Sequence, residues 1–223
     1  MGRREHQLQR QRDAEFSHKL RQVDMDYDSS HHLDTGGKIE LNNLSIDSDS
    51  KWQGTFYQAV FPDHFRQSIE SIRIQPQDYL FVDIGAGKGR ALFLAQDMGF
   101  RRVIGIEFAQ ELVRICEENI RRRAEDGRSR SPIEILHMDG LSYDLPEQPT
   151  VFYLFNPFGQ ELMVRMAERI RNSLQKAPRT IKLIYENPLY DHVIMTGIPG
   201  LRRRAQTRLF NTYEWVPPRD SSK

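Results

Sequence analysis

The chain has 223 residues, and its 32 lysines and arginines nearly balance its 31 aspartates and glutamates, for a formal net charge of +1. This balance gives no indication of nucleic acid or an anionic membrane as a partner. The single cysteine, Cys116, excludes an internal disulfide framework and is typical of a reducing compartment, so we expect a cytoplasmic location. Apolar runs are too short to span a bilayer and the basic N-terminus lacks an apolar stretch, so we expect no membrane partner and no secretory signal.

Residues 1–30 make a polar arm that is basic at first and acidic around Asp24, Asp26 and Asp28. A segment of this composition has little apolar surface to bury, so we expect a loose helix or a disordered arm. In the segment that follows, the short alternation of Ile39 and Leu41 favours a brief edge strand. The apolar spacing over 55–74, interrupted by a proline, favours one or two helices.

From residue 76 onward, short apolar segments rich in β-formers alternate with segments of helical periodicity. Strands are expected at 78–85, 102–107, 133–138, 150–156, 180–187 and 209–217, and helices at 88–98, 109–124 and 160–175. The second of these helices turns Cys116 inward and its arginines outward, while 189–207 is less regular. Alternating apolar strands and helices predict a parallel sheet covered on both faces, in one doubly wound α/β domain with an N-terminal helical extension.

The loop after the first strand has the spacing D-x-G-x-G-x-G, formed by Asp83, Gly85, Gly87 and Gly89. In such sheets ligands bind beyond the carboxyl ends of the strands, and glycine lets a ligand approach the backbone closely. The loop does not match a dinucleotide fingerprint, because Arg90 stands where the last glycine belongs, and it does not match a phosphate-binding loop. A structural turn is the alternative.

The next strands also end in polar residues. Glu107 ends the second strand, where a carboxylate can accept hydrogen bonds from both hydroxyls of a ribose. Asp139 follows the third strand, and Asn156 and Phe158 follow the fourth. Each of these positions also has an ordinary reading, as a surface acid or a turn.

In this order, "VDIGAGKGR", "VIGIE", "HMDG" and "FNPF" resemble the class I S-adenosylmethionine-dependent methyltransferases over residues 79–187, about half of the chain. The "GKGR" loop looks like that of small bacterial members with unassigned acceptors and, less closely, that of histone-lysine methyltransferases outside the SET class. The resemblance implies a Rossmann-like seven-stranded sheet of order 3-2-1-4-5-7-6 with the seventh strand antiparallel. It makes 31–218 a single methyltransferase domain, with 31–75 as an extension or lid, 76–218 as the core and 219–223 as a tail.

The resemblance also implies roles for single residues, with S-adenosylmethionine as the cofactor. Asp83 and the glycine-loop backbone would face the methionine part, Glu107 the ribose, and Asp139 with the Gly140 backbone the adenine. The implied cofactor-binding residues are Asp83, Gly85, Ala86, Gly87, Gly89, Glu107, Phe108, Asp139, Gly140 and Asn156. The implied residues of the transfer site are Asn156, Phe158 and Tyr57, the last in a segment, "GTFYQ", that folds over the cofactor in related enzymes. Glu186 and Asn187 are further candidates near this rim.

The acceptor is expected to be a protein or a small molecule that the sequence does not identify. Adenine-modifying enzymes carry N-P-P-Y or D-P-P-Y where this chain has N-P-F, so nucleic acid is not favoured. The arginine runs at 121–123 and 202–204 are expected to be a solvated helix end and a charged loop. His31 and His32 lack spaced companion ligands, so no metal site is expected. A regulatory module without transfer activity and a nicotinamide-dependent oxidoreductase stay open as alternatives, and the sequence does not indicate an oligomeric state.

Overall fold

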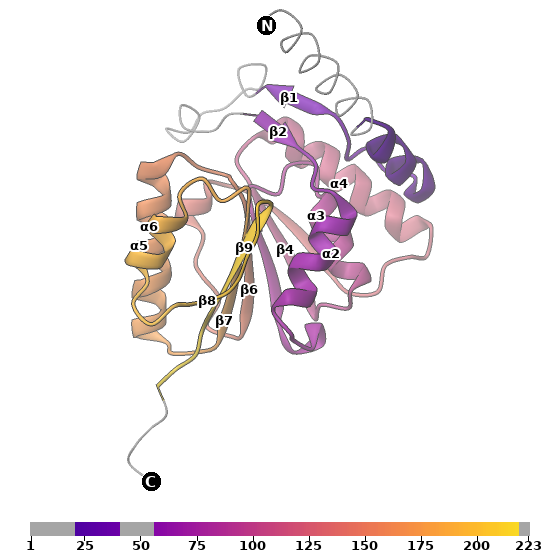
Figure 1. Cartoon of the computed structure of the whole chain (residues 1–223). Coiled ribbons are helices and arrows are strands. Elements are labelled where there is room, and N and C mark those ends of the chain that lie inside the picture. The colour runs from indigo at the N-terminus through magenta and orange to yellow at the C-terminus, as the bar shows by residue number, and fades with distance from the viewer. Residues whose placement is uncertain (1–20, 41–55, 219–223) are drawn as a thin grey trace, which may run out of the picture.

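The computed structural model describes residues 21–40 and 56–218, in which one seven-stranded sheet forms the centre (Figure 1). Its strands are β3 (Leu80–Ile84), β4 (Arg102–Glu107), β5 (Ile133–His137), β6 (Thr150–Phe155), β7 (Ile181–Glu186), β8 (Arg202–Gln206) and β9 (Phe210–Trp215). The order is β5-β4-β3-β6-β7-β9-β8, and β9 is antiparallel to both of its neighbours. The predicted order, with an antiparallel seventh strand, is confirmed. The expected C-terminal tail, 219–223, and residues 1–20 lie outside the described residues.

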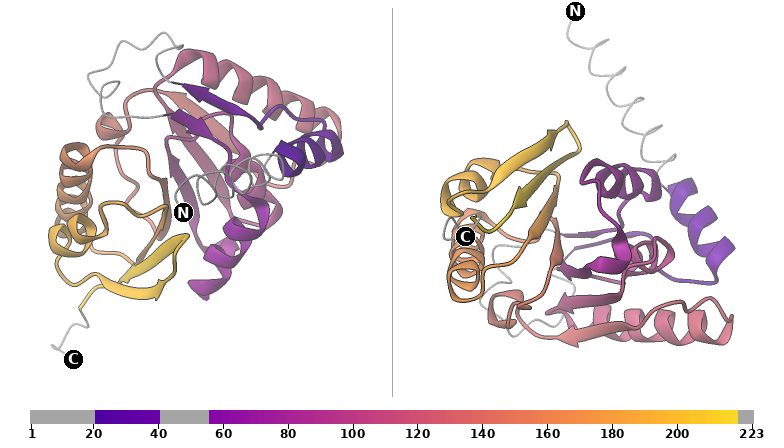
Figure 2. Two further views of the ribbon diagram at one scale, coloured as in Figure 1. Left: turned by 45° about the horizontal axis from the view of Figure 1, so that its top comes forward. Right: turned by 90° about the horizontal axis from the view of Figure 1, so that it is seen from below.

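Helices cover both faces of the sheet, as two further views show (Figure 2). On one face lie α2 (Pro62–Ser71), α3 (Arg90–Asp97) and α4 (Gln110–Glu125), and on the other α5 (Gln160–Lys176) and α6 (Asp191–Gly197), with short 3-10 turns η3 (Pro76–Asp78) and η4 (Gly140–Ser142). Successive residues of β3 alternate between the two cores: Phe81 packs on the α3 side and Val82 on the α5 side. Within the described residues no helix is long and apolar enough to cross a membrane.

The segment before the core differs from its prediction. Residues 56–58 form strand β2 (Phe56–Gln58), which pairs antiparallel with β1 (Lys38–Glu40), and helix α2 begins only at Pro62. Proline suits the first turn of a helix because the missing N–H would have no partner there. Residues 56–58 form a strand because they pair with residues 38–40, and helical periodicity does not detect pairing between separate segments.

The region 189–207 is also more regular than predicted, since it holds α6 and strand β8. The arginines of 202–204 therefore lie on an edge strand and not in a loop. Arg203 pairs with Asp191, and Arg204 pairs with Glu214 of the neighbouring strand. Charged side chains on an edge strand oppose pairing with another sheet edge, which fits this position.

Residues 21–31 are helical, and this part of the polar arm packs on the domain. Tyr27 is buried in the core on the α3 side, and its ring lies under the guanidinium of Arg90, with the carbon at 4.8 Å from the ring centroid. The helix is thus attached to the domain by the contact of its own Tyr27 ring with Arg90, a cation of the glycine loop. A polar composition does not reveal such an attachment.

Arg123 of α4 corrects the prediction that the arginines of this helix face outward. It is 2% exposed, donates to Gln96 Oε1 at 2.6 Å, pairs with Asp97 and lies over the ring of Phe93. A long cation is tolerated at a buried position when carboxylate, amide and aromatic partners surround it.

Arg123→Ala is therefore expected to lower the free energy of unfolding by about 1.5–3 kcal/mol, the usual range for hydrogen bonds to a charged group. Arg121→Ala is the matched control on the same helix, because Arg121 is exposed and its ion pairs with Glu118 and Glu125 are screened by water. The control is expected to change stability by no more than about 0.5 kcal/mol. Urea unfolding followed by circular dichroism compares the two, and equal losses would show that the Arg123 contacts do not stabilise the fold.

Candidate active site

One pocket lies at the carboxyl ends of β3, β4, β6 and β7, under residues 57–60. It brings together these residues predicted from the sequence: Tyr57, Asp83, Gly85, Ala86, Glu107, Phe108, Asn156 and Asn187. Because carboxyl ends of parallel strands meet at one edge of a sheet, residues far apart in the chain converge there. Arg90 and Tyr153 line the same pocket.

The glycine loop turns tightly from β3 into α3. The N–H groups of Gly85 and Ala86 both donate to the carbonyl oxygen of Ile106, at 2.8 and 3.0 Å. Gly87 has a φ of 56°, and a Cβ on it would lie 2.2 Å from Cε2 of Tyr57. Only glycine lets the Tyr57 ring lie this close to the loop backbone.

Glu107 ties this loop to the end of β4. Its carboxylate accepts hydrogen bonds from the N–H of Gly87 and the N–H of Ala109, both at 2.9 Å, and the residue is 4% exposed. Burial raises the pKa of Glu107, and the backbone hydrogen bonds oppose that rise by favouring the charged form. Each carboxylate oxygen has two lone pairs, so both oxygens keep the capacity to accept a ligand hydroxyl.

Asp83 provides a second buried carboxylate in the pocket. The residue is 3% exposed, and its Oδ1 has no hydrogen-bond partner within the described residues. Burial raises its pKa well above the usual range, and the nearby Glu107 raises it further. A buried acceptor atom without a partner is uncommon in proteins, so Oδ1 suits a ligand that brings a hydrogen-bond donor.

Two asparagines follow the strands on the opposite side of the pocket. Asn156 after β6 and Asn187 after β7 have φ angles of 44° and 48°, a left-handed conformation that asparagine tolerates better than most residues. The Tyr185 hydroxyl donates to Asn156 Oδ1 at 3.3 Å, which orients this side chain. Uncommon backbone conformations of this kind gather at functional sites.

Tyr153 and Glu186 form a buried phenol and carboxyl pair beside these asparagines. They are 1% and 3% exposed, and neither the Tyr153 hydroxyl nor Glu186 Oε1 has a hydrogen-bond partner of normal geometry within the described residues. Burial raises the pKa of Glu186 to about 8, while the Tyr153 hydroxyl lowers it to a smaller extent. The pair therefore provides an acid whose protonation changes near neutral pH.

Six predicted residues do not line the pocket: Gly87 and Gly89 of the glycine loop, Glu186 at the end of β7, and Phe158, Asp139 and Gly140. Phe158 is buried in the core on the α5 side, where its ring would contact a Cβ built on Gly140 at 3.3 Å. The chain turns inward after Asn156, so Phe158 does not line the pocket, and its role at the transfer site stays a prediction. Asp139 accepts a hydrogen bond from the N–H of Leu141 at 2.8 Å and so caps η4, and neither it nor Gly140 lines the pocket. Contact of these two with an adenine stays a prediction.

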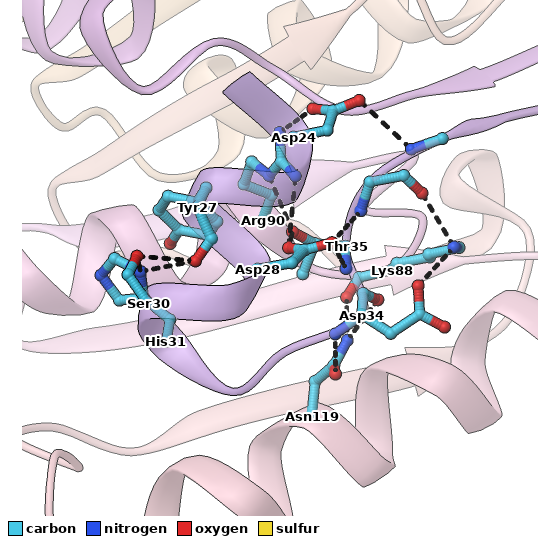
Figure 3. Close-up of polar contacts among 12 residues, drawn as sticks. Asp24, Tyr27, Asp28, Ser30, His31, Asp34, Thr35, Lys88, Arg90 and Asn119 are labelled. Atoms are coloured by element: carbon cyan, nitrogen blue, oxygen red, sulfur yellow. Dashed lines mark hydrogen bonds and ion pairs between the residues drawn. The ribbon is translucent and has the colours of Figure 1, made fainter. Parts of the chain in front are cut away.

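The sequence interpretation missed Tyr153 in the pocket and three acids of the N-terminal segment. Asp24 and Asp28 pair with Arg90, and Asp34 pairs with Lys88 (Figure 3). The signal available in the sequence was the spacing of Asp24 and Asp28, which places two carboxylates on one face of a helix. Among the described residues no group of three His, Cys, Asp or Glu side chains is arranged to hold a metal ion.

Sequence comparison relates the chain to one much larger protein, and no protein-family model matches it. The chain is 33% identical over 144 residues to the "Histone-lysine N-methyltransferase, H3 lysine-79 specific" of Dictyostelium discoideum. The match spans 58% of this chain but only 8% of that protein. The relationship therefore concerns one region of that protein.

Solved structures share the fold at low sequence identity. A predicted N6-adenine-specific DNA methylase from Listeria monocytogenes aligns over 72% of this chain and 52% of its own, with a TM-score of 0.52 and 15% identity. A candidate RNA methyltransferase from Pyrococcus horikoshii aligns over 79% of this chain and 96% of its own, with a TM-score of 0.50 and 12% identity. Together with the order and directions of the strands, these likenesses identify the architecture. The chain therefore has the fold of the class I S-adenosylmethionine-dependent methyltransferases.

Proposed function

We propose that the chain is an S-adenosylmethionine-dependent methyltransferase that uses this pocket. The observation that carries the proposal is the buried Asp83, whose Oδ1 has no hydrogen-bond partner in the described part of the chain, beside the glycine loop and Glu107 at the carboxyl edge of this sheet. Asp83 suits the ammonium group of the cofactor's methionine part, because a cationic donor would satisfy its orphaned oxygen. Glu107 suits the ribose hydroxyls, and the neighbouring Phe108 provides an apolar surface. When bound, the cofactor supplies an electrophilic methyl group on a positively charged sulfonium.

The residues of the other side of the pocket would handle the acceptor. Asn156 and Tyr57 position it, since a displacement at carbon requires the attacking atom to lie in line with the bond that breaks. An amine or hydroxyl acceptor must also lose a proton. Glu186, with its raised pKa, takes that proton through the adjacent Tyr153, which lines the pocket.

A protein amine is the acceptor class to test first. The name of the Dictyostelium relative supports a lysine side chain, while a small-molecule amine or hydroxyl is the second class. Nucleic acid is not favoured, because the motif after β6 is N-P-F and the net charge is +1. The single cysteine supports a cytoplasmic location for the reaction.

Transfer of a radiolabelled methyl group from S-adenosylmethionine into fractionated cell extract tests this function. We expect the label to appear in a protein or small-molecule fraction only when the purified chain is added to the extract. Cofactor binding without any labelled product would favour a regulatory module instead. Binding of NAD would favour the oxidoreductase alternative, against which Arg90 in place of the last fingerprint glycine argues.

Asn156→Ala is expected to lower kcat by about 10–100-fold, because a misplaced acceptor loses alignment with the methyl group. Binding of S-adenosylhomocysteine is expected to change by less than about threefold, or about half of the free energy of a tenfold step in affinity. The control is Asn172→Ala, an exposed asparagine on α5. Loss of binding together with kcat would place Asn156 in the cofactor site, and an unchanged kcat would remove it from the transfer site.

A further inference from the structure

We propose that Lys88 and Arg90 are positioning residues that fasten residues 24–36, here called the N-terminal strap, to the glycine loop, and that this attachment couples cofactor binding to closure of the pocket by Tyr57. The inference rests on the proposed function, since the glycine loop is the part that would hold the cofactor. It gives a role to the two cations that distinguish this loop, "GKGR", from a loop of small residues.

Arg90 is the first point of attachment (Figure 3). The side chain is 1% exposed, its Nε donates to Thr35 Oγ1 at 2.7 Å, and its guanidinium pairs with Asp24 and, at 3.3 Å, with Asp28. Its planar group also lies over the ring of Tyr27. A guanidinium buried to this degree needs such partners, because an unpaired buried charge is strongly unfavourable. The strap supplies all of these contacts.

Lys88 is the second point of attachment. Its Nζ donates to Asp34 Oδ1 at 2.7 Å and to the Gly36 carbonyl oxygen at 2.9 Å. Asn119 of α4 links the strap to the glycine loop, because its Nδ2 donates to the carbonyl oxygens of Asp34 at 2.8 Å and of Lys88 at 3.2 Å. The strap is thus bound to the loop and to the helix that packs beside it.

A short chain of contacts leads from the strap to the pocket. Thr35 donates its N–H and its hydroxyl to Asp28, at 2.8 and 2.5 Å. The carbonyl oxygen of Thr35 then accepts a hydrogen bond from the Tyr57 hydroxyl at 2.5 Å, and the Tyr57 ring lies against Gly87. Arg90 itself lines the pocket. The loop that would contact the cofactor and the ring that covers it are therefore both held by the strap, the loop through ion pairs and the ring through the hydrogen bond to Thr35.

Coupling follows from this geometry. A ligand that fixes the glycine loop also fixes Lys88 and Arg90, which favours the attached strap and the covering position of Tyr57. A detached strap leaves Arg90 without its carboxylates at the pocket wall, beside a cofactor whose sulfonium is also positive. Detachment is therefore expected to weaken cofactor binding, and cofactor binding is expected to slow the opening of the strap.

The experiment uses the full chain with S-adenosylhomocysteine as the probe. Affinity is measured by calorimetry, and hydrogen–deuterium exchange of residues 24–36 is measured with and without the probe. Two variants break the attachment from opposite sides, Arg90→Gln on the loop and Asp24→Asn/Asp28→Asn on the strap. Arg121→Gln is the control, an exposed arginine with ion pairs of its own. We expect each attachment variant to weaken binding by about tenfold, within the usual range for coupled sites, and their combination to weaken it little further.

In the wild type the probe is expected to increase protection of residues 24–36, and in the attachment variants this increase is expected to be lost. A charge exchange provides a rescue test: Lys88→Asp alone weakens binding, and Lys88→Asp with Asp34→Lys restores it at least in part. Lowered thermal stability with unchanged affinity in every variant would show a merely structural strap and overturn the inference. A wild type that does not bind the probe would instead overturn the proposed function, and with it the coupling.

Discussion

Replacing Glu107 with alanine is expected to weaken binding of S-adenosylmethionine and S-adenosylhomocysteine by about 10–100-fold, or ~1.4–2.7 kcal/mol. Two causes act together. The ribose hydroxyls lose a charged acceptor, and the N–H groups of Gly87 and Ala109, each 2.9 Å from the carboxylate, lose their hydrogen bonds. The glycine loop is then no longer tied to β4. Calorimetric titration of the variant against the wild type measures the change.

The control for this prediction is Glu134→Ala on the neighbouring strand β5. Glu134 is partly exposed and pairs with Arg102, away from the pocket lining. Its removal is expected to leave cofactor affinity within about twofold, since exposed ion pairs contribute little. Equal affinity of wild type and Glu107→Ala would contradict the ribose assignment, while equal losses in both variants would indicate a general effect on the fold.

Glu186→Gln is expected to make the protein more stable at alkaline pH and less active. Burial raises the pKa of Glu186 from 4.5 to about 8, so between these two pH values the folded state holds a proton that the unfolded state has released. The stability of the wild type therefore falls as the pH rises from about 4.5 to about 8 and stays lower above that. Glutamine is neutral throughout, so the variant is expected to exceed the wild type by about 2–4 kcal/mol at pH 9 and to differ little at pH 5.

Denaturant unfolding at several pH values measures this difference, and Glu168→Gln, an exposed acid on α5, is the control that keeps the wild-type dependence. The rate of transfer provides the second measurement. If Glu186 receives the acceptor proton, the wild-type kcat rises with pH up to about 8, and the variant loses this rise together with about 100-fold in kcat. A stabilised variant with unchanged kcat and the same pH profile would exclude Glu186 from proton transfer. Enzymes commonly have active-site residues that lower the stability of the fold while they serve activity.

The parallel core was predictable because its signals are local. Strands β3, β4, β6 and β7 are short apolar runs, and each has a polar residue within its last two positions or directly after them. Their convergence into a pocket follows from parallel pairing alone. The pairing of β1 with β2 was not predictable in the same way, because the two strands are separated in the sequence and short periodic patterns do not report distant partners.

Side-chain direction and charge pairing account for the other differences. Phe158 follows the same strand as Asn156, but the left-handed Asn156 turns the chain so that the aromatic ring enters the core. Arg90 and Arg123 are buried because carboxylates and aromatic rings surround them, and those partners come from elsewhere in the chain. From the sequence alone, an arginine is expected to face water.

The most direct test of the central claim is calorimetric titration of the full chain with S-adenosylmethionine, S-adenosylhomocysteine and NAD in separate experiments. The arrangement of Asp83, the glycine loop and Glu107 predicts dissociation constants in the micromolar range for both sulfur ligands and no binding of NAD. Weakening of both affinities by about 10–100-fold in Glu107→Ala would place the ligands in the pocket described above. No binding of either sulfur ligand by the wild type would contradict the account, and the glycines of the loop would then serve a turn or another ligand.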